Sequence, residues 1–452
     1  MLLDRDVAEL YSVETREVNQ AVPTSVILTQ VLHLTRNDII STMKHLLSTL
    51  FCAAAALCLS ACNLLGIGEN NNPYKTIDLS TKAGVYVEKG NDFALEFTDR
   101  INSAEKKDYI VSPLSMQFLL GMILNGAQGD TADEICSVLG YGAGEIEDVN
   151  QFCKSLLEQL PKLDKKTTIN LANAIFVDDG WPLKDSYVSS VGKTYSAKIA
   201  NLDFSKGEAS AKVINRWCSD QTNGMIKKVI EQTDPDMLCY LLNALYFKSQ
   251  WTEKFNKSNT ADETFTDEAG NKSTVKMMKQ NESFSYQHND VFKIVRMPYG
   301  NGAFSMVALL PQEGKTIADA LDEIKESGWR ETLRSMVHCS VDLWLPRFET
   351  KYHIDLNDIL SAMGMPTSFT DSADFKAMSD YALKLSFVQQ DAVIKVDEEG
   401  TEAAAVSMAG MMKDAAAAPG EHVVFHADHP FLYFITEAST GAILFAGRYS
   451  NQ

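Results

Sequence analysis

The chain has 452 residues, a formal net charge of −19 and a hydrophobic content of 45%. This length suits two or three average domains or one large domain, with enough apolar residues for a sizeable core. The acidic balance disfavours a nucleic-acid partner, because such a partner requires basic residues that face the phosphates.

Cysteine usage excludes two further classes of protein. None of the 8 cysteines belongs to a C-x-x-C pair. The later five are widely scattered, so we interpret them as small buried apolar side chains rather than as a disulfide framework or a zinc site. These five are Cys136, Cys153, Cys218, Cys239 and Cys339.

Residues 43–62 have the composition of a secretory signal. They begin with the basic string MKH, continue with an apolar run and end in small residues. The final four residues, LSAC, resemble the lipobox of bacterial lipoproteins. The resemblance implies that Cys62 is lipidated and anchors the protein in the bacterial cell envelope, at the outer membrane or the cell surface, with residues 63–80 as a tether. A plain signal peptide and a buried helix are the alternatives.

Residues 1–42 precede that signal, although a signal of this kind works at the N-terminus. Residues 3–21 resemble the start of the phage-type DNA-binding domain known as ORF6N, but about twenty residues are too few to fold. We therefore expect Met43 to be the true start and residues 1–42 to be a wrongly assigned extension, which N-terminal sequencing can decide. A DNA-binding regulator is a third hypothesis, which the acidic charge and the signal disfavour.

The body of the chain begins with helical patterns. Residues 91–104 have apolar positions at a roughly helical period. Ser112 and the proline after it can begin a buried helix that ends near Gly126. Asp130 or Thr131 can then cap the next helix.

Two apolar segments predicted as strands each contain one asparagine. Residues 171–177 carry Asn173, and residues 241–255 carry Asn243 followed by Trp251. A buried amide needs hydrogen-bonding partners to offset the loss of water. We therefore expect both asparagines to form specific hydrogen bonds rather than only to fill space in the core.

Two later segments also alternate as strands do. Residues 383–397 form a long strand that leads directly into the stretch described below. Residues 426–448 form two apolar strands joined by a Ser-Thr-Gly turn.

The sequence contains no catalytic motif. It lacks G-x-S-x-G, H-E-x-x-H, a phosphate loop and a glycine-rich dinucleotide turn, so we assign no catalytic residue. His422, His426 and His429 lie close together, but cysteine or carboxylate ligands at matching spacing are missing, so we assign no metal site. A hydrolase site built from distant residues stays open.

The stretch Val396–Pro419, VDEEGTEAAAVSMAGMMKDAAAAP, has an unusual composition. After an acidic start it continues without a proline from Thr401 to Ala418, and a central strand tolerates none. With the period of a strand, one face is small as far as Met411 and the other carries the only charge. Alanine-rich segments also favour helix, so composition alone leaves a linker, a helix and a strand open. The small face comprises Thr401, Ala403, Ala405, Ser407, Ala409 and Met411.

Residues 397–405, DEEGTEAAA, resemble the hinge of the reactive-centre loop of inhibitory serpins. Further blocks in the family's order extend the resemblance to about residues 81–452. It implies an α+β serpin fold of multi-domain type, with a large central, mostly antiparallel sheet, smaller sheets, about eight or nine helices and an exposed loop at about residues 398–424. It also implies which residues form the shutter and breach where the sheet opens: Ser112, Asn173, Asn243, Trp251 and Gln390.

The resemblance implies an inhibitor that traps its enzyme. A serine or cysteine endopeptidase cuts the loop and forms a covalent acyl complex, and the freed segment then inserts as a new central strand. The intact state is metastable, so its lifetime is kinetic. We expect a secreted monomer without a cofactor, located outside the cell or in the periplasm. The implied hinge comprises Glu398, Glu399, Gly400, Thr401, Glu402, Ala403, Ala404 and Ala405.

The family's usual hinge-to-cleavage spacing places the reactive bond at Asp414–Ala415, which suits an Asp-specific protease. Cleavage after Lys413 suits a trypsin-like protease, and cleavage after Met411 or Met412 suits elastase-, chymotrypsin- or subtilisin-like ones. Counting back from the C-terminal side gives a different position, because this loop is longer than the family norm there. The window 411–416 therefore stays open.

Two points limit what the resemblance implies. Where animal serpins often have histidine, this chain has Gln390, which does not titrate near neutrality, so a pH-sensitive shutter is in doubt. The alternative function is a non-inhibitory surface lipoprotein that is cleaved without trapping the protease. The small side chains that follow Thr401 favour the inhibitor, because they leave water at little cost.

Overall fold

The computed structural model describes residues 71–142, 144–386, 388–401 and 422–452. The chain divides into two compact units between Asn71 and Asn72, and everything below concerns the second. The predicted signal with Cys62 lies outside the described residues. So does the part of the predicted loop that holds Glu402, Ala403, Ala404, Ala405, Met411, Met412, Lys413, Asp414 and Ala415.

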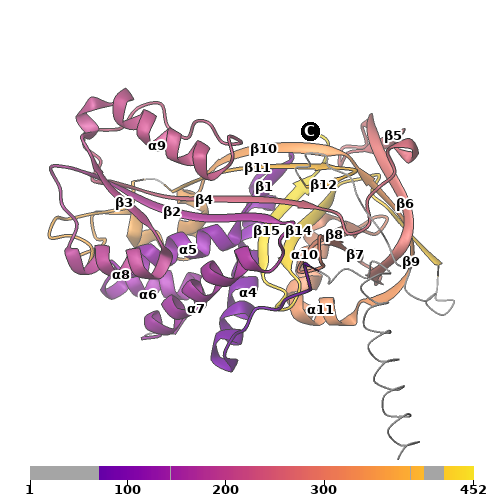
Figure 1. Cartoon of the computed structure of the whole chain (residues 1–452), viewed down its shortest axis with the longest axis horizontal. Helices are drawn as coiled ribbons and strands as arrows, with labels where there is room; N and C mark the ends of the chain where they lie inside the picture. The colour runs from indigo at the N-terminus through magenta and orange to yellow at the C-terminus, as the bar shows by residue number, and fades with distance from the viewer. Residues whose placement is uncertain (1–70, 143, 387, 402–421) are drawn as a thin grey trace, which may run out of the picture. The chain divides into compact units, whose positions relative to one another are not determined.

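A six-stranded sheet contains the strands around the predicted hinge (Figure 1). Its neighbours are antiparallel except for the parallel pair β2 and β3. The order is β10 (Phe348–Asp355), β11 (Gln389–Asp397), β12 (Gly400–Thr401), β4 (Cys239–Gln250), β2 (Thr168–Asp178) and β3 (Lys198–Leu202).

A second sheet of nine strands forms the rest of the β-structure. Its order is β1 (Tyr109–Val111), β15 (Ile443–Tyr449), β14 (Phe431–Glu437), β8 (Phe304–Pro311), β7 (Phe292–Tyr299), β6 (Lys272–His288), β9 (Val337–Pro346) and β13 (His422–His426), with β5 (Ala261–Thr266) beside β6. The two C-terminal strands predicted from residues 426–448 are β14 and β15, which confirms that hairpin. The Glu437 carboxylate accepts hydrogen bonds from Ser439 and Thr440 and so fixes the turn between them.

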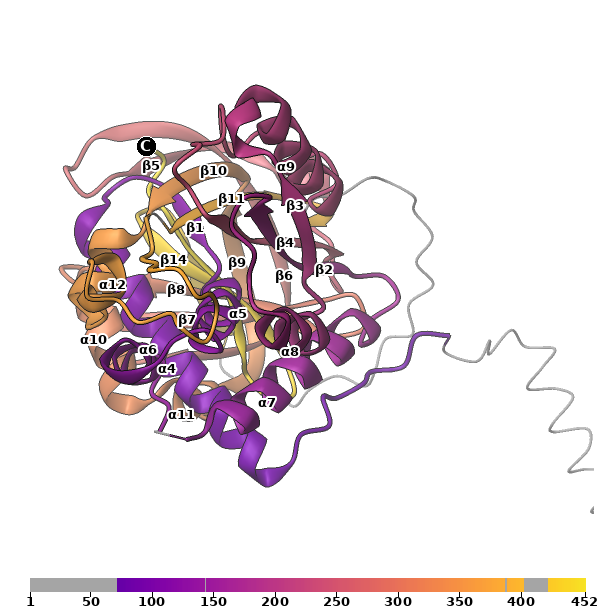
Figure 2. The ribbon, with the colours of Figure 1, turned by 90° about the vertical axis from the view of Figure 1, so that its left-hand side faces the viewer.

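Nine α-helices lie in the described residues, and none of them is long and apolar enough to cross a membrane. In Figure 2, α9 lies on one face of the six-stranded sheet and α5 on the other, which agrees with the two apolar clusters. The helices are α4 (Thr81–Ala104), α5 (Pro113–Leu124), α6 (Gly129–Val138), α7 (Ile146–Gln159), α8 (Asp185–Tyr195), α9 (Glu208–Gln221), α10 (Ile317–Ser327), α11 (Trp329–Ser335) and α12 (Asn357–Met363).

In the N-terminal part of the body, the start of α5 agrees with that predicted from the sequence, whereas the start of the next helix does not. Ser112 caps α5 by accepting from the Ser115 N–H, as its position before a proline predicts. The next helix begins at Gly129, with Gln128 as its N-cap. The prediction that Asp130 or Thr131 caps it is therefore wrong, because the Thr131 hydroxyl instead accepts from the Asp374 N–H in a distant loop.

Residues 72–80 belong to the second unit, although the sequence analysis placed them in the tether. Ile77 is buried, and its N–H donates to Ser439 Oγ at 3.0 Å. The Asp78 N–H donates to Gln159 Oε1 at 2.8 Å. Because these contacts hold the segment against the body, a tether can extend no further than Asn71.

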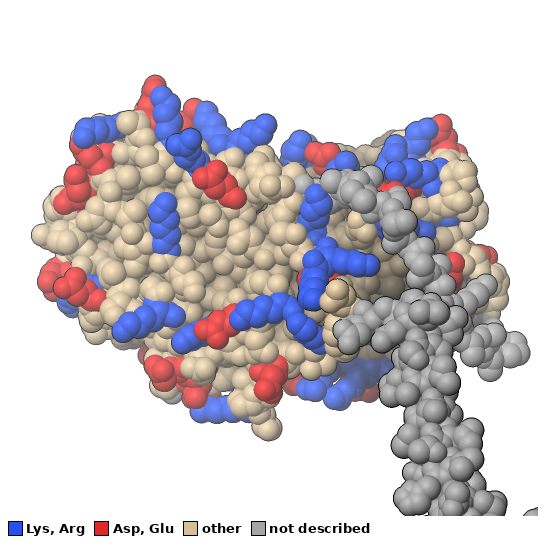
Figure 3. Space-filling view, in the orientation of Figure 1, with Lys and Arg blue, Asp and Glu red and all other residues tan. Residues whose placement is uncertain are grey.

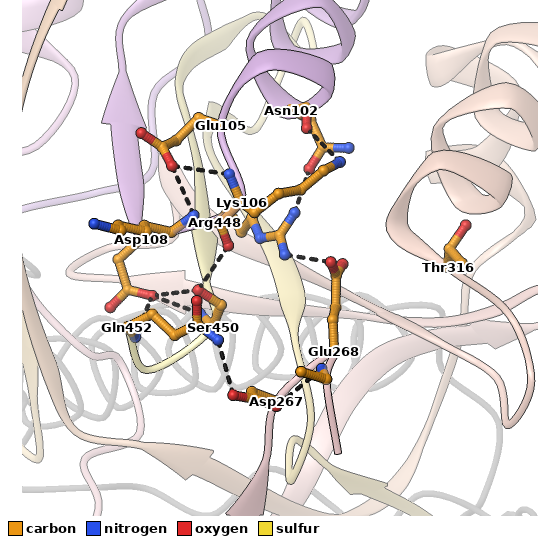
Figure 4. A network of polar contacts seen from close by, with 12 residues as sticks. Asn102, Glu105, Lys106, Asp108, Asp267, Glu268, Thr316, Arg448, Ser450 and Gln452 are labelled. Carbon is orange, nitrogen blue, oxygen red and sulfur yellow. Dashed lines mark hydrogen bonds and ion pairs between the residues drawn. The ribbon is translucent and has the colours of Figure 1, made fainter. Parts of the chain in front are cut away.

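The C-terminal strand is fixed by a buried charge (Figure 4). Arg448 in β15 is 0% exposed; it donates to Asn102 Oδ1 at 2.9 Å, and its Nη2 lies 2.8 Å from Glu268 Oε1. Beyond the strand, Asp108 accepts from both the N–H and the hydroxyl of Ser450. A buried cation of this kind depends on its partners, so the network ties the chain end to α4 and to the turn between β5 and β6.

Candidate functional site

The predicted hinge begins where β11 ends, and its first strand residues already form part of the six-stranded sheet. Gly400 pairs with Asp397 and with Gln250, and Thr401 pairs with Val396 and Ser249. β12 therefore lies between β11 and β4 (Figure 1). The described part of the hinge therefore forms a two-residue strand between β11 and β4.

Both residues of β12 suit that narrow place. A Cβ atom on Gly400 would lie 2.2 Å from the Ser249 carbonyl oxygen, so only glycine fits. Thr401 is 2% exposed, and its hydroxyl lies 2.6 Å from the Tyr299 hydroxyl. The buried threonine thus has the polar partner that its burial requires.

Aromatic side chains support the turn before β12. The Trp251 ring stacks on Tyr299, with ring centroids 4.3 Å apart and planes 12° apart. The Trp251 indole N–H donates to the Asp397 carbonyl at 2.8 Å, and the Phe255 N–H donates to the Glu398 carbonyl at 3.1 Å. Because the Trp251 ring is stacked and its N–H is hydrogen-bonded, this side chain holds the turn before β12 in place.

The two acidic hinge residues, Glu398 and Glu399, are held by hydrogen bonds and by nearby basic side chains. The carboxylate of Glu399 accepts from Lys254 at 2.8 Å and lies 3.1 Å from Lys257, and these hydrogen bonds lower its pKa. Glu398 is buried, accepts from the Thr260 hydroxyl at 2.8 Å and lies 3.7 Å from Arg347. Because the pKa of Glu399 is lowered, its contribution to stability is present at neutral pH and is lost as the pH falls through that lowered pKa.

Beyond β12, two edges of the six-stranded sheet face each other and are not paired with each other in the described residues. β11 pairs along its length with β10, and β4 pairs along its length with β2. In the part of the chain that the structure describes, β11 and β4 are joined only through β12. The backbone groups along the rest of both edges remain strong donors and acceptors.

One predicted shutter pair lies on the β11 side of this gap. Gln390 Nε2 donates to the Ser112 carbonyl at 3.0 Å, and the Ser112 N–H donates to Gln390 Oε1 at 2.7 Å. The Ser112 hydroxyl donates to the Leu444 carbonyl at 2.8 Å. The amide of Gln390 thus uses both its donor and its acceptor on one backbone unit at the start of α5.

The other predicted pair lies on the β4 side. Asn243 Nδ2 donates to Asn173 Oδ1 at 2.8 Å, and Asn173 Nδ2 donates to the Tyr195 carbonyl at 2.8 Å. The remaining oxygen, Asn243 Oδ1, is buried and has no hydrogen-bond partner among the described residues. A buried acceptor in this state costs free energy until a donor reaches it.

The structure therefore brings the predicted residues together in three groups rather than one. Trp251 and the hinge form the upper group, and the two amide pairs form the others, on opposite sides of the gap. The roles of these residues in sheet opening stay predictions. Sequence reasoning missed Tyr299 and the lysines that hold Glu399, because their partners are remote in sequence and no motif marks them.

Comparison with known proteins gives a consistent result. The family described as Serpin (serine protease inhibitor) matches residues 88–452. Serpin B6 of Pongo abelii is 34% identical over 377 residues, which cover 81% of this chain and 99% of that protein. Serpin B3 of Homo sapiens is 32% identical over 390 residues, which cover 80% and 98%.

Solved structures in different states also resemble the chain. The thermophilic serpin tengpin in the native state has a TM-score of 0.74 at 28% identity, covering 84% of this chain and 97% of that one. Human thyroxine-binding globulin, solved in complex with thyroxine, has a TM-score of 0.74 at 26% identity, and the match covers 81% of this chain and 98% of that one. A cleaved Serpin 42Da has a TM-score of 0.73 at 25% identity and covers 81% and 98%. These likenesses extend over the described fold as a whole.

The contact between Tyr299 and Thr401 can be tested directly. Tyr299→Phe keeps the ring on Trp251 but leaves the Thr401 hydroxyl buried without a partner, a loss of ~1–2 kcal/mol. We expect hydrogen exchange at the amides of Gly400 and Thr401 to become about tenfold faster. Tyr86→Phe is the matched control, because the Tyr86 hydroxyl is buried without a partner. Equal exchange at the hinge in both variants would contradict the assigned contact.

Proposed function

This chain belongs to the serpin family, and we propose that it is a suicide-substrate inhibitor of serine endopeptidases, with cysteine endopeptidases as a second target class. The observation that carries the proposal is the place of β12. It lies between β11 and β4, whose facing edges are otherwise joined by no described strand. A segment that follows Thr401 can extend β12 along both edges.

The register of β12 predicts where such a segment would pair. Six residues beyond Thr401, Ser407 comes opposite Asn243 (249 − 6) and Gln390 (396 − 6). Ten residues beyond Thr401, Met411 comes opposite Cys239 (249 − 10), the first residue of β4. At about 3.3 Å per residue, this strand is roughly 33 Å long.

The side-chain alternation fits the same register. Thr401 faces the core, where it meets Tyr299, so every second residue after it would also face the core. Those residues are small until Met411. Glu402 would face the opposite side, where its charge can remain in water. Insertion along this register therefore buries no charge near its start.

A cavity lies where the predicted strand ends. Its volume is about 370 Å³, and it lies between the beginnings of β4 and β11. Its lining is largely apolar and includes Leu241, Leu385 and Val388. Met411 is flexible and apolar, so it suits an irregular space of this kind.

The proposed chemistry is an interrupted acyl transfer. The protease serine Oγ attacks the carbonyl carbon of Asp414, the amide bond to Ala415 breaks, and the new α-amine of Ala415 leaves with a proton. The ester that joins protease and Asp414 remains while the upstream segment inserts. Each new ladder hydrogen bond contributes ~1 kcal/mol, so about a dozen drive the protease away from its working geometry.

We also propose where the inhibitor is located in the cell. The lipobox-like residues 59–62 support a lipid anchor at Cys62, which would hold the inhibitor at the bacterial cell envelope. The described residues would then stand outside the membrane, where secreted proteases meet them. Mass spectrometry of the native N-terminus tests this part, since a diacylglyceryl group on Cys62 is the expected modification.

Thr401→Arg tests the inhibitory mechanism. Arginine at this position would have to bury an unpaired charge beside Tyr299, so insertion should stall. With a protease that cuts within residues 411–416, we expect loop cleavage to continue while the yield of SDS-stable complex falls by roughly tenfold or more. Glu402→Arg is the matched control, because its side chain is predicted to face water, and it should retain the complex.

Two results would contradict this mechanism. Unchanged inhibition by Thr401→Arg would mean that insertion does not start at the hinge. The absence of any SDS-stable complex from the wild-type protein, with the loop cut normally, would favour the alternative of a surface lipoprotein that is cleaved without trapping. Thyroxine-binding globulin, which is solved with thyroxine, is a relative of this fold with a binding role.

The orphaned oxygen of Asn243 provides a second test. In the predicted register Ser407 pairs opposite Asn243, so the Ser407 hydroxyl can donate to Asn243 Oδ1. Ser407→Ala should lower the stability of the cleaved protein by ~1 kcal/mol and leave the intact protein unchanged. Ser407→Thr, which keeps a hydroxyl, is the control. Identical melting of cleaved wild-type and cleaved Ser407→Ala proteins would contradict the register.

A further inference from the structure

Four exposed lysines form a basic surface on this acidic chain. Lys162, Lys165 and Lys166 belong to the loop before β2, and Lys75 lies in the segment beside it. None of the four forms an ion pair with a carboxylate in the described residues, whereas other lysines do, among them Lys82, Lys89, Lys184 and Lys325. Figure 3 shows basic side chains gathered on the face where β2 begins. These four residues are called the lysine surface below.

Hydrogen bonds hold the two segments of the lysine surface together. Lys75 Nζ donates to the Lys162 carbonyl at 3.0 Å, and the Lys165 N–H donates to Asn72 Oδ1 at 2.9 Å. Asn301 Nδ2 donates to the carbonyls of Pro73 and Leu163. The lysines are therefore carried on a fixed backbone rather than on two independent loops.

The acidic residue within the loop is turned away from the surface. Asp164 is 2% exposed, and its carboxylate accepts from Asn72, from the Lys166 N–H and from the Thr167 hydroxyl. The Asp164 carboxylate is buried and hydrogen-bonded within the loop. Its negative charge therefore does not neutralise the exposed lysine side chains. Asp78, three residues after Lys75, is the exposed acid of this segment, so the lysines outnumber the exposed acids here.

An exposed aromatic residue lies in the same segment. Tyr74 is 49% exposed, between Asn72 and Lys75. Tyrosine has an apolar ring and a polar hydroxyl, and it is enriched where proteins meet the headgroup region of a bilayer. An aromatic side chain within a cluster of lysines is the composition expected of a surface that contacts anionic lipid.

The length of the chain limits how far this surface can be from a membrane anchor. This step rests on the lipid anchor at Cys62 proposed above. Ten residues separate Cys62 from Asn72, and a fully extended chain of that length spans at most ~35 Å. Lys75 lies three residues after Asn72, so the anchor would keep the lysine surface close to the headgroups.

We propose that the lysine surface docks on the anionic phospholipid headgroups of the membrane that holds the anchor. One acyl anchor together with a basic surface binds a bilayer more stably than either alone. The chain as a whole has a formal net charge of −19 and is repelled by anionic lipid, so a cationic face is favoured for the approach. Docking would thus orient the inhibitor as well as retain it.

Vesicle binding by the mature chain from residue 62, made unlipidated with Cys62→Ser, tests the surface without the anchor. We expect binding to phosphatidylethanolamine–phosphatidylglycerol vesicles, none to phosphatidylcholine vesicles, and weakening as salt is raised. Substitution of Lys75, Lys162, Lys165 and Lys166 by glutamine should weaken binding at least ~10-fold. The matched control replaces four exposed lysines elsewhere that have no ion pair, Lys193, Lys227, Lys272 and Lys315.

Equal binding by the two fourfold variants would overturn the proposal. So would tighter wild-type binding to soluble polyphosphate than to the anionic vesicles, since the surface would then serve a soluble polyanion. Protease inhibition in solution is measured in parallel and should be unchanged in both variants. A loss of vesicle binding therefore tests the lysine surface, and a failure to inhibit tests the proposed function, independently of each other.

Discussion

Two strand edges face each other on either side of β12, and no other described strand lies between them. β11 and β4 are each paired on their outer sides, and β12 joins them at one end. Unpaired backbone edges attract any strand that can reach them. A segment that enters here gains hydrogen bonds on both sides at once, which no edge addition at the rim of a sheet can do. The place of β12 therefore matters more than any single side chain.

The intact chain is limited in how far it can use these edges. Thr401 is the last described residue in the six-stranded sheet, and the next described residue, His422, lies in β13 of the other sheet. While both ends are held, further insertion must pull on β13. A cut between them removes that restraint. The hinge contacts around Tyr299 and Glu399 hold the starting position, and the separate amide pairs of Gln390 and Asn243 flank the path that insertion would take.

Much of this arrangement could be predicted from the sequence. The cap at Ser112, the C-terminal hairpin and the strand that leads into the hinge follow from local residue patterns. The partners of these groups could not be predicted, because they come from remote segments. Tyr299 lies in an ordinary strand, yet it provides both the ring under Trp251 and the hydroxyl for Thr401. Helix boundaries were equally hard, as Gln128 shows, since tertiary hydrogen bonds decided which residue caps the helix.

The central claim is that the intact protein is metastable and that a cut in the loop releases it. Thermal unfolding of the intact protein and of protein nicked within residues 411–416 tests this most directly. We predict that the nicked protein melts at least ~10 °C higher, because about a dozen new ladder bonds form once the segment is free. A nicked protein that melts at the same temperature as the intact one, or lower, would contradict the account.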